Sequence, residues 1–358
     1  MFKQAVLAVT LASAWNGVAK AQTSEPEILG APTCDRPTLM NSMPMDKVPG
    51  SNLMTVTVNI NDKPQKMLFD IGRAYSQVWI STAAKLHLAE ESWGSDWDFG
   101  GRYSQNAARV GRLNLGSIQS GGFYIHVSPD PTVASAPFDG LLRNDVMWMY
   151  DIDLDFAHQK FNYFSPEQCK GAGIYWSPTT ITSVPIVAYA GTQYGNQSPI
   201  PRLGATYVVA TLEGHAIVAL LDTSADRSFL NPVVAKTIFK LNTESFDAGE
   251  INDGGTLIKA GLHRFSSLTL GGLTASNFQI AVPLDIKTGS SQITHISRTE
   301  RQYYDLHEIL PDLVIGMDLL RHSHLYVSYK NDRVYVSAAG EGTELKIGEI
   351  KPSRLNVR

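Results

Sequence analysis

One pattern occurs twice in this chain, and it limits the possible folds more than any other feature of the sequence. Residues 53–70 (LMTVTVNINDKPQKMLFD) and 206–222 (TYVVATLEGHAIVALLD) each alternate apolar and polar residues and then end on an aspartate. Each stretch predicts a strand, a tight turn and a second strand, with the turns at Asn61-Asp62 and Glu213-Gly214. The chain is therefore predicted to contain two similar β-rich halves.

Three further blocks repeat in the same order. The paired blocks are a helical segment (80–91 and 231–242), a strand, glycine turn and strand (109–127 and 261–282), and a closing segment that aligns without gaps (141–164 and 314–337). Four matched blocks in one order indicate an internal duplication.

The duplication makes Asp70 and Asp222 equivalent residues, because each ends one of the two matched hairpins. If a two-fold axis relates the two halves, equivalent residues face each other across that axis, so the two carboxylates would meet. Close carboxylates cannot both ionise easily, and such a pair shares a proton. The protonated acid can polarise a carbonyl while its partner activates water. The other interpretation is that both acids are ordinary turn residues.

The N-terminus has the features of an export signal. Lys3 precedes a short apolar run at residues 5–15, and Ala19-Lys20-Ala21 is a small-x-small cleavage site. We expect a mature chain that begins at Gln22. No other apolar run reaches the ~18 residues of a membrane span, so we expect an exported protein, periplasmic or secreted, without a membrane span.

Charge and cysteine content narrow the function classes. The formal net charge is −4, and no basic stripe is present, so nucleic acid is not an expected partner. The chain has two cysteines, Cys34 and Cys169. In an oxidising compartment such a pair favours a disulfide over a metal site or a redox pair.

Taken together, the sequence resembles the retropepsin/pepsin class of aspartic proteases, and specifically exported bacterial two-lobed members. The resemblance rests on the aspartate after each hairpin, the helix that follows it, and the block LVIGMDLL (313–320) with Gly316 and Asp318. It implies a mostly β fold of two lobes with an active-site cleft between them. It also implies that Asp70 and Asp222 are catalytic and that a peptide or unfolded protein is the substrate.

The expected organisation follows from the repeats. We expect a signal peptide (1–21), an N-terminal segment (22–47), a first lobe (48–170), a linker rich in Gly, Pro, Ser and Thr (171–202), a second lobe (203–345) and a C-terminal tail (346–358). Both lobes lie in one chain, so a monomer is expected. No metal or organic cofactor is implied.

The active-site loops depart from the family's Asp-Thr/Ser-Gly triplet. The first loop has Ile71 before Gly72, so it lacks a hydroxyl, and the second has Thr223 but then Ser224 in place of glycine. Ser224 would be strained if its φ were positive. An Arg73 guanidinium close to Asp70 would favour the ionised acid.

The closing block of the first lobe departs as well, because Arg143 aligns with Gly316 of the second lobe. These changes leave three hypotheses: an active aspartic endopeptidase, a pseudo-protease that binds peptides without cleaving them, and a structural envelope protein.

Three other groups of residues have both a functional and a structural interpretation. Trp97, Phe99 and Tyr103 are candidates for a substrate-binding flap, or else they cover the core of the lobe. A second group, at positions 151, 153 and 155, is a row of aspartates that could hold a cation but is better explained as a solvated strand face. The third group, His322 and His324, is not expected to bind metal because the first lobe has no counterpart.

Overall fold

A computed structural model describes residues 37–97, 103–133, 137–166, 181–187, 205–242, 246–284, 311–340 and 354–355. All of them belong to one unit, Asp35–Arg358. In this part of the chain, no helix is both long enough and apolar enough to cross a membrane.

Both predicted hairpins are present. The first consists of β3 (Met54–Ile60) and β4 (Lys63–Phe69), and the second of β13 (Tyr207–Leu212) and β14 (His215–Leu221). Their two-residue turns have positive φ at both positions, 47° and 64° in the first turn and 46° and 82° in the second. Such turns match the right-handed twist of the paired strands, which is why Asn-Asp and Glu-Gly are found there.

The first hairpin belongs to a mixed sheet, called here the first sheet. Its strand order is β2-β3-β4-β9-β5-β8-β7-β6, and β3 also pairs with β7. Its further strands are β2 (Asp46–Lys47), β5 (Gln77–Trp79), β6 (Glu90–Trp97), β7 (Tyr103–Leu115), β8 (Ile118–Ser128) and β9 (Gly140–Leu142). Beside this path, β22 (Arg354–Leu355), from the segment predicted as a tail, pairs with β8.

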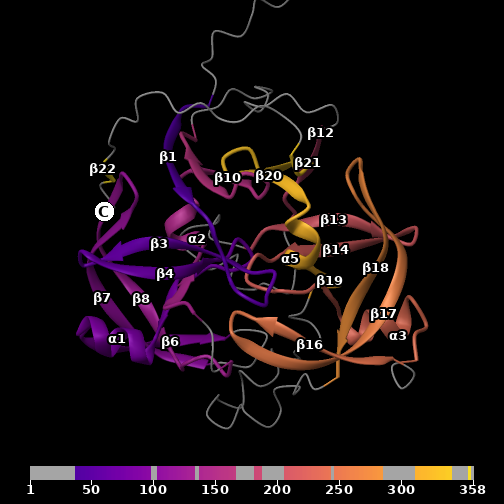
Figure 1. Ribbon diagram of the computed structural model, residues 1–358, viewed down its shortest axis with the longest axis horizontal. Helices are drawn as coiled ribbons and strands as arrows, with labels where there is room; N and C mark the ends of the chain where they lie inside the picture. Colours follow the sequence, from indigo (N-terminus) through magenta and orange to yellow (C-terminus); the bar gives the residue numbers. More distant parts are fainter. Residues whose placement is uncertain are drawn as a thin grey trace, which may run out of the picture. The chain divides into compact units, whose positions relative to one another are not determined.

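The second sheet repeats this order as β13-β14-β19-β15-β18-β17-β16, and β13 also pairs with β17. Its further strands are β15 (Phe229–Leu230), β16 (Asp247–Asp253), β17 (Thr256–Leu270), β18 (Leu273–Pro283) and β19 (Leu313–Ile315). In both sheets the strand after the aspartate is parallel to one neighbour and antiparallel to the other. The prediction of a mostly β protein with two similar halves is confirmed (Figure 1).

The two predicted helices are shorter than the sequence suggested. Helix α1 spans Ile80–Leu86 and ends at His87, which has a left-handed conformation (φ 54°), and the chain then enters β6. Helix α3 spans Pro232–Thr237, and the side chain of Asn231 caps its first turn by accepting from the Val233 amide. Strong pairing of β6 with β7 competes for residues that the helical pattern had included. Two single-turn helices, α2 (Asn144–Met147) and α5 (Met317–Leu320), occupy equivalent places after β9 and β19.

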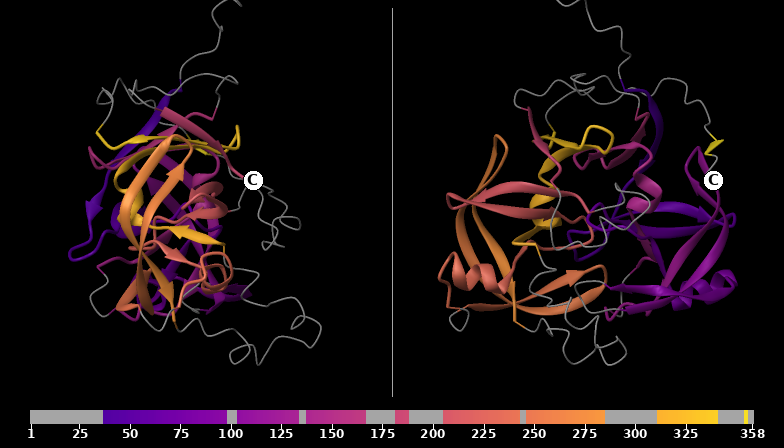
Figure 2. Two further views of the ribbon diagram at one scale, coloured as in Figure 1. Left: turned by 90° about the vertical axis from the view of Figure 1, so that its right-hand side faces the viewer. Right: turned by 180° about the vertical axis from the view of Figure 1, so that it is seen from behind.

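A third sheet joins the two halves, and we call it the joining sheet. Its order is β1-β11-β10-β20-β21-β12. The strands are β1 (Leu39–Pro44), β10 (Asp151–Asp155), β11 (Lys160–Phe164), β12 (Ile181–Pro185), β20 (Ser323–Ser328) and β21 (Arg333–Ala338). The central pair is β10 with β20, one from each half, and Figure 2 shows these strands side by side in magenta and yellow. Strand β12 lies in the segment predicted as a linker.

The prediction that the aspartates of β10 form a solvated face is wrong. Asp151, Asp153 and Asp155 are buried, with 0%, 0% and 6% of their surface exposed. Each carboxylate has polar side-chain partners. Asp151 accepts from hydroxyl groups, Asp153 bonds with Asn162 and His324, and Asp155 bonds with His158. Among the described residues, no three His, Cys, Asp or Glu side chains gather in a way that could hold a metal ion.

His324 and Asp153 connect the halves through side chains, because His324 Nε2 lies 2.7 Å from Asp153 Oδ1. Burial opposes protonation of His324, but the hydrogen bond and charge of Asp153 outweigh it and raise the pKa of His324 above 6.5. The raised pKa means that protonation stabilises the fold. This contribution is complete below about pH 6.5 and is lost as the pH rises through the folded-state pKa.

We therefore expect His324→Gln to lower the free energy of unfolding by roughly 3 kcal/mol at pH 5.5, because it leaves Asp153 buried without its cation. The loss should be smaller at pH 9, as measured by urea unfolding at the two pH values. The exposed His87, changed to Asn, serves as the control. A loss that does not depend on pH would contradict the assignment.

Candidate active site

Asp70 and Asp222 lie at equivalent points of the two sheets. Each follows the second strand of its hairpin, and each backbone amide donates to the strand beside it, Asp70 N to Leu142 O (2.8 Å) and Asp222 N to Ile315 O (3.0 Å). Neither aspartate has exposed surface. Equivalent strand pairing in the two halves of the chain therefore places both carboxylates in a buried environment.

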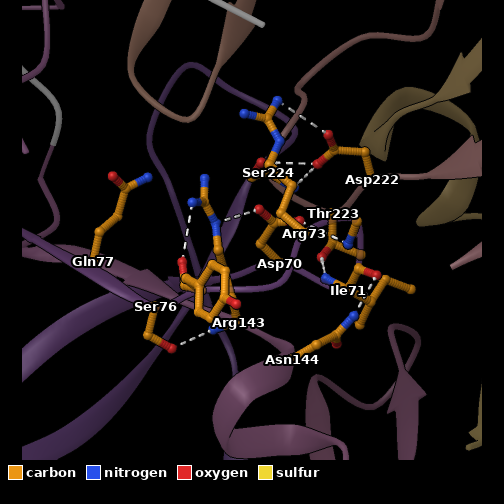
Figure 3. A network of polar contacts seen from close by, with 12 residues as sticks. Asp70, Ile71, Arg73, Ser76, Gln77, Arg143, Asn144, Asp222, Thr223 and Ser224 are labelled. Atoms are coloured by element: carbon orange, nitrogen blue, oxygen red, sulfur yellow. Dashed lines mark hydrogen bonds and ion pairs between the residues drawn. The ribbon is translucent and has the colours of Figure 1, made fainter. Parts of the chain in front are cut away.

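The two carboxylates lie close together, with Gly72 between them. A Cβ atom on Gly72 would come within 3.1 Å of both Asp70 Oδ1 and Asp222 Cγ, so even a methyl group there would require the carboxylates to shift by a few tenths of an ångström. The loops hold the acids in the same way, because the Gly72 amide donates to Asp70 Oδ1 (2.8 Å) and the Ser224 amide donates to Asp222 Oδ1 (2.8 Å). Figure 3 shows Asp70 and Asp222 in the same network, with Ser224 bonded to Asp222. The structure thus brings together the two acids that the sequence singled out.

A second pair of equivalent contacts supports each loop. In the first half, Ser76 Oγ donates to Asp145 and accepts from the Arg143 amide at 2.8 Å. The second half repeats this arrangement with Ser228, Asp318 and Gly316, at 2.6 Å and 2.9 Å. The gapless alignment of residues 141–164 with 314–337 pairs Asp145 with Asp318, but it did not show that each aspartate bonds to a serine.

Thr223 connects the two halves directly. Its hydroxyl donates to Phe69 O (2.7 Å) and accepts from the Ile71 amide (3.3 Å). Ile71, which lacks a hydroxyl, is fully buried and contributes its backbone instead. Its carbonyl accepts from Thr206 Oγ1 (2.9 Å) and from Asn144 Nδ2 (3.1 Å), two residues that sequence reasoning missed. The missing hydroxyl therefore does not leave the interface between the halves without polar contacts.

Arg143 is the most important residue that the sequence did not explain. It was seen only as an arginine at a glycine position, yet its Nε donates to Asp70 Oδ2 at 2.8 Å and only 1% of the residue is exposed. Its terminal nitrogens reach Tyr75 O (3.1 Å) and, with the Gln77 amide in its favoured orientation, Gln77 Oε1 (2.8 and 2.9 Å). Arg143 thus provides a buried counter-charge for Asp70.

The second lobe cannot hold an arginine at the matching position. A Cβ on Gly316 would approach the backbone of Arg227 to 2.6 Å and that of Ala225 to 2.9 Å. The corresponding loop of the first lobe leaves room for Arg143. The charge environments of the two aspartates therefore differ although their backbones are equivalent.

The guanidinium of Arg73 lies beside Asp222 and Asp253. Its Nη2 atom lies 3.7 Å from Asp222 Oδ2 and bonds both oxygens of Asp253, at 3.0 and 2.8 Å. The neighbour of Asp70 is Arg143 instead. Arg73 and Arg143, both from the first lobe, are thus divided between the two acids, which no local sequence pattern could reveal.

Ser224 is not strained. It is absent from the described residues with positive φ, so the conformation that would disfavour a side chain does not occur there. Its hydroxyl donates to Asp222 Oδ1 at 2.8 Å, and the Ala225 amide donates to the same oxygen at 3.2 Å. The serine adds a donor where glycine would have none.

The pKa of Asp222 is raised to about 7. Burial is the largest cause, and the negative charge of Asp70 also raises it, while Arg73 and the Ser224 hydroxyl act in the opposite direction. Asp222 Oδ2 has no hydrogen-bond partner among the described residues. A protonated Asp222 beside an Asp70 that pairs with Arg143 is therefore the arrangement this geometry favours.

The flap predicted around Trp97, Phe99 and Tyr103 coincides with a hairpin of the first lobe. In the first lobe, β6 and β7 pair, and the backbones of Trp97 and Tyr103 are partners. Phe99 and the side chains of Trp97 and Tyr103 lie outside the described residues, so their contact with substrate stays a prediction. Cys34 and Cys169 lie outside them too, and so does the predicted disulfide.

The flap-like hairpin of the second lobe, β16–β17, is bonded to the Asp222 loop. The Gly254 amide donates to Ser224 O (2.9 Å), and the Asp226 amide donates to Asn252 O (2.9 Å). Its tip also meets the first lobe, because the Val133 amide donates to Gly255 O (3.2 Å). The hairpin tip, residues 252–255, therefore contacts both halves next to the paired acids.

Comparison with known families agrees with this geometry. Residues 208–319 match a family described as Aspartyl protease. The match includes Asp222 and the block with Gly316 and Asp318. No curated protein matches the chain. The second lobe is thus similar to aspartyl proteases, and the first has the same strand order.

The contact between Thr223 and the first lobe can be tested by Thr223→Val. This change keeps the shape but leaves Phe69 O and the Ile71 amide without the hydroxyl, so we expect a loss of ~1–3 kcal/mol in the free energy of unfolding. Thr223→Ser keeps the hydroxyl and should lose clearly less. Equal losses for the two variants in urea unfolding would contradict the importance of the hydroxyl.

Proposed function

We propose that the chain is an exported aspartic-type endopeptidase that hydrolyses peptide bonds with a water molecule activated by Asp70 and Asp222. The observation that carries the proposal is the unequal environment of the two adjacent carboxylates. Asp70 pairs with Arg143, whereas the pKa of Asp222 is raised to about 7. One base and one acid at the same point are what water-mediated acyl hydrolysis needs.

In the proposed reaction, Asp70 takes a proton from the water molecule while the water oxygen attacks the carbon of the peptide carbonyl. Asp222 gives its proton to the carbonyl oxygen, which produces a neutral tetrahedral diol. When the C–N bond breaks, Asp70 passes its proton to the leaving nitrogen and Asp222 recovers one from a hydroxyl of the diol. The acids exchange roles between the two steps, and every proton is accounted for without a metal or cofactor.

The surrounding residues have supporting roles in this proposal. Arg143 holds the negative charge on Asp70, and the amides of Gly72 and Ser224 orient the two carboxylates. Thr223 keeps the two loops in register. The cleft between the lobes would hold an extended peptide, and the β6–β7 hairpin would cover it. Export to the periplasm or the medium rests on residues 1–21 alone.

A catalytically impaired, peptide-binding pseudo-protease is the second candidate. It is favoured by the burial of both carboxylates and by the hairpin tip bonded to the Asp222 loop. Such a protein would bind peptides in the same cleft and leave them intact. Hydrolysis separates the two candidates.

The first test is hydrolysis of a mixture of fluorogenic peptides by the full chain between pH 3 and pH 9. We expect cleavage that falls on the order of 10²–10⁴-fold in Asp70→Asn and in Asp222→Asn, because each removes a proton-transfer group. In both variants, asparagine is close in size to the aspartate that it replaces. If the folded protein cleaves no peptide at any pH, the proposed peptidase activity is contradicted and the pseudo-protease is favoured.

The pH profile tests the proton assignment. Since Asp222 must be protonated to act first as the acid, activity should hold below about pH 7 and fall above it. The Ser224 hydroxyl lowers the pKa of Asp222, so Ser224→Ala should move this alkaline limit to higher pH. The exposed Ser276, changed to Ala, is the control. A limit that does not move, or moves down, would contradict the assignment.

A further inference from the structure

The backbone next to Asp70 is held by residues from both halves of the chain. The Ile71 carbonyl oxygen accepts from Asn144 Nδ2 (3.1 Å), from Thr206 Oγ1 (2.9 Å) and from the Thr206 amide (3.2 Å). Asn144 belongs to the first half and Thr206 to the second, and neither has exposed surface. Figure 3 shows the Asn144 side chain directed at Ile71. The loop is thus fixed at the residue that follows the acid.

Tyr329 determines how Asn144 is oriented. It lies directly after β20, and its hydroxyl donates to Asn144 Oδ1 at 2.7 Å. Tyr329 is itself buried. Because the amide oxygen of Asn144 is held by this donor, the NH2 group on the other side is directed at Ile71 O. A tyrosine from the second half therefore acts on the Asp70 loop through one intermediate residue.

The Tyr329 hydroxyl keeps its proton from acid to neutral pH. Burial raises the pKa of Tyr329 above its usual value, and the negative charges of Asp70 and Asp151 raise it as well, against the opposite effect of the Thr206 hydroxyl. The donor to Asn144 is therefore permanent. The effect of Asp70 also shows that Tyr329 lies within electrostatic reach of the acid whose loop it supports.

The three residues that support Ile71 have apolar, buried counterparts in the other lobe. The gapless alignment of 141–164 with 314–337 supplies two of the pairs, and the matching registers of the two hairpins supply the third. The pairs are Asn144 with Met317, Tyr329 with Phe156, and Thr206 with Met54. No counterpart has a side chain that can donate a hydrogen bond. The polar support is therefore specific to the Asp70 loop.

This difference is the reverse of the difference between the two loops themselves. The second loop has Thr223, whose hydroxyl donates to Phe69 O in the other half, whereas Ile71 has no hydroxyl to donate. The loop that cannot donate across the interface is thus the one that receives hydrogen bonds at its carbonyl. The polar groups of the network do for the first loop what its own side chain cannot do.

We propose that Tyr329 is a positioning residue for the two acids: through Asn144 it holds the Ile71 carbonyl and so keeps the Asp70 carboxylate beside Asp222. Without the Tyr329 hydroxyl, the Asn144 amide loses the donor that sets its orientation, and its hold on Ile71 O weakens. The consequence for catalysis rests on the proposed function, but the placement of the two carboxylates does not.

The experiment measures the titration of Asp222 by NMR of carbon-labelled aspartate carboxyl groups, in the unchanged chain and in Tyr329→Phe. The Asp222→Asn variant identifies its signal. Burial is the largest cause of the raised pKa of Asp222, about 7, and the charge of Asp70 is the next. The other groups that act on it are Arg73, Asp253 and the Ser224 hydroxyl.

Movement of Asp70 away from Asp222 weakens the effect of its charge, so the pKa of Asp222 should fall in Tyr329→Phe by about half a pH unit or more. A merely structural role of Tyr329 would instead lower the stability of the fold and leave this titration unchanged.

Further variants assign the effect to the network. Thr206→Val removes the other side-chain donor to Ile71 O and should also lower the pKa of Asp222, whereas Thr206→Ser keeps the hydroxyl and should preserve it. Asn144→Ala removes the link, so adding Tyr329→Phe to it should have no further effect. Tyr335→Phe removes a hydroxyl from a half-buried tyrosine of the neighbouring strand β21 and should change nothing.

An unchanged pKa of Asp222 in folded Tyr329→Phe would overturn the proposal, as would equal shifts in Thr206→Val and Thr206→Ser. If Tyr329→Phe does not fold, Asn144→Ala removes the residue through which Tyr329 acts. An unchanged pKa of Asp222 in that variant overturns the proposal equally.

Hydrolysis of the fluorogenic peptides by the same proteins separates this proposal from the proposed function. In a peptidase, Tyr329→Phe should lower kcat about tenfold or more with little change in KM, because the two acids lose their alignment. A shifted pKa of Asp222 in a chain that cleaves nothing supports the positioning role and rejects the peptidase. Cleavage with both kcat and the titration unchanged in Tyr329→Phe supports the peptidase and rejects the positioning role.

Discussion

The burial of two aspartates next to each other is the constraint on which the rest of the site depends. Two negative charges a few ångströms apart in a poorly hydrated interior repel strongly, so at least one must be neutralised. The chain does this in two ways. Arg143 neutralises Asp70 as an ion pair, while burial and the nearby negative charge favour a proton on Asp222. Gly72 packs tightly between the two carboxylates, since a Cβ there would lie 3.1 Å from both Asp70 Oδ1 and Asp222 Cγ.

This difference between the acids arises on a backbone that is nearly the same in both lobes. The strand order, the parallel pairings and the serine–aspartate contacts are equivalent. What differs is the space beside each loop. At Gly316 the backbone of the neighbouring loop excludes any side chain, whereas the first lobe accommodates a complete arginine at Arg143. Two equal scaffolds can therefore hold one base and one acid, because side-chain substitutions change the electrostatics without changing the strand pairing.

The hairpins and the repeated order of strands were predicted from local patterns, and the structure confirms both. Alternation and turn residues located both hairpins, and the repeated order of blocks predicted two similar sheets. Expectations that depended on distant neighbours were less successful. The aspartates of β10 looked like a solvated face because their partners, such as His324, come from the other half of the chain. Arg73 follows Asp70 closely in sequence, yet its guanidinium lies beside Asp222 and Asp253, which belong to the other half.

The sequence by itself determined the strands, the turns and the two positions at which an aspartate ends a buried hairpin, because these follow from residue periodicity and from turn conformations within a few residues. Only the tertiary structure decided which cation faces which acid. Arg143 and Asp253 are far in sequence from the groups they pair with, and their positions depend on how loops from separate strands pack. The charge state of a buried carboxylate is set by groups within a few ångströms in space, whatever their distance along the chain.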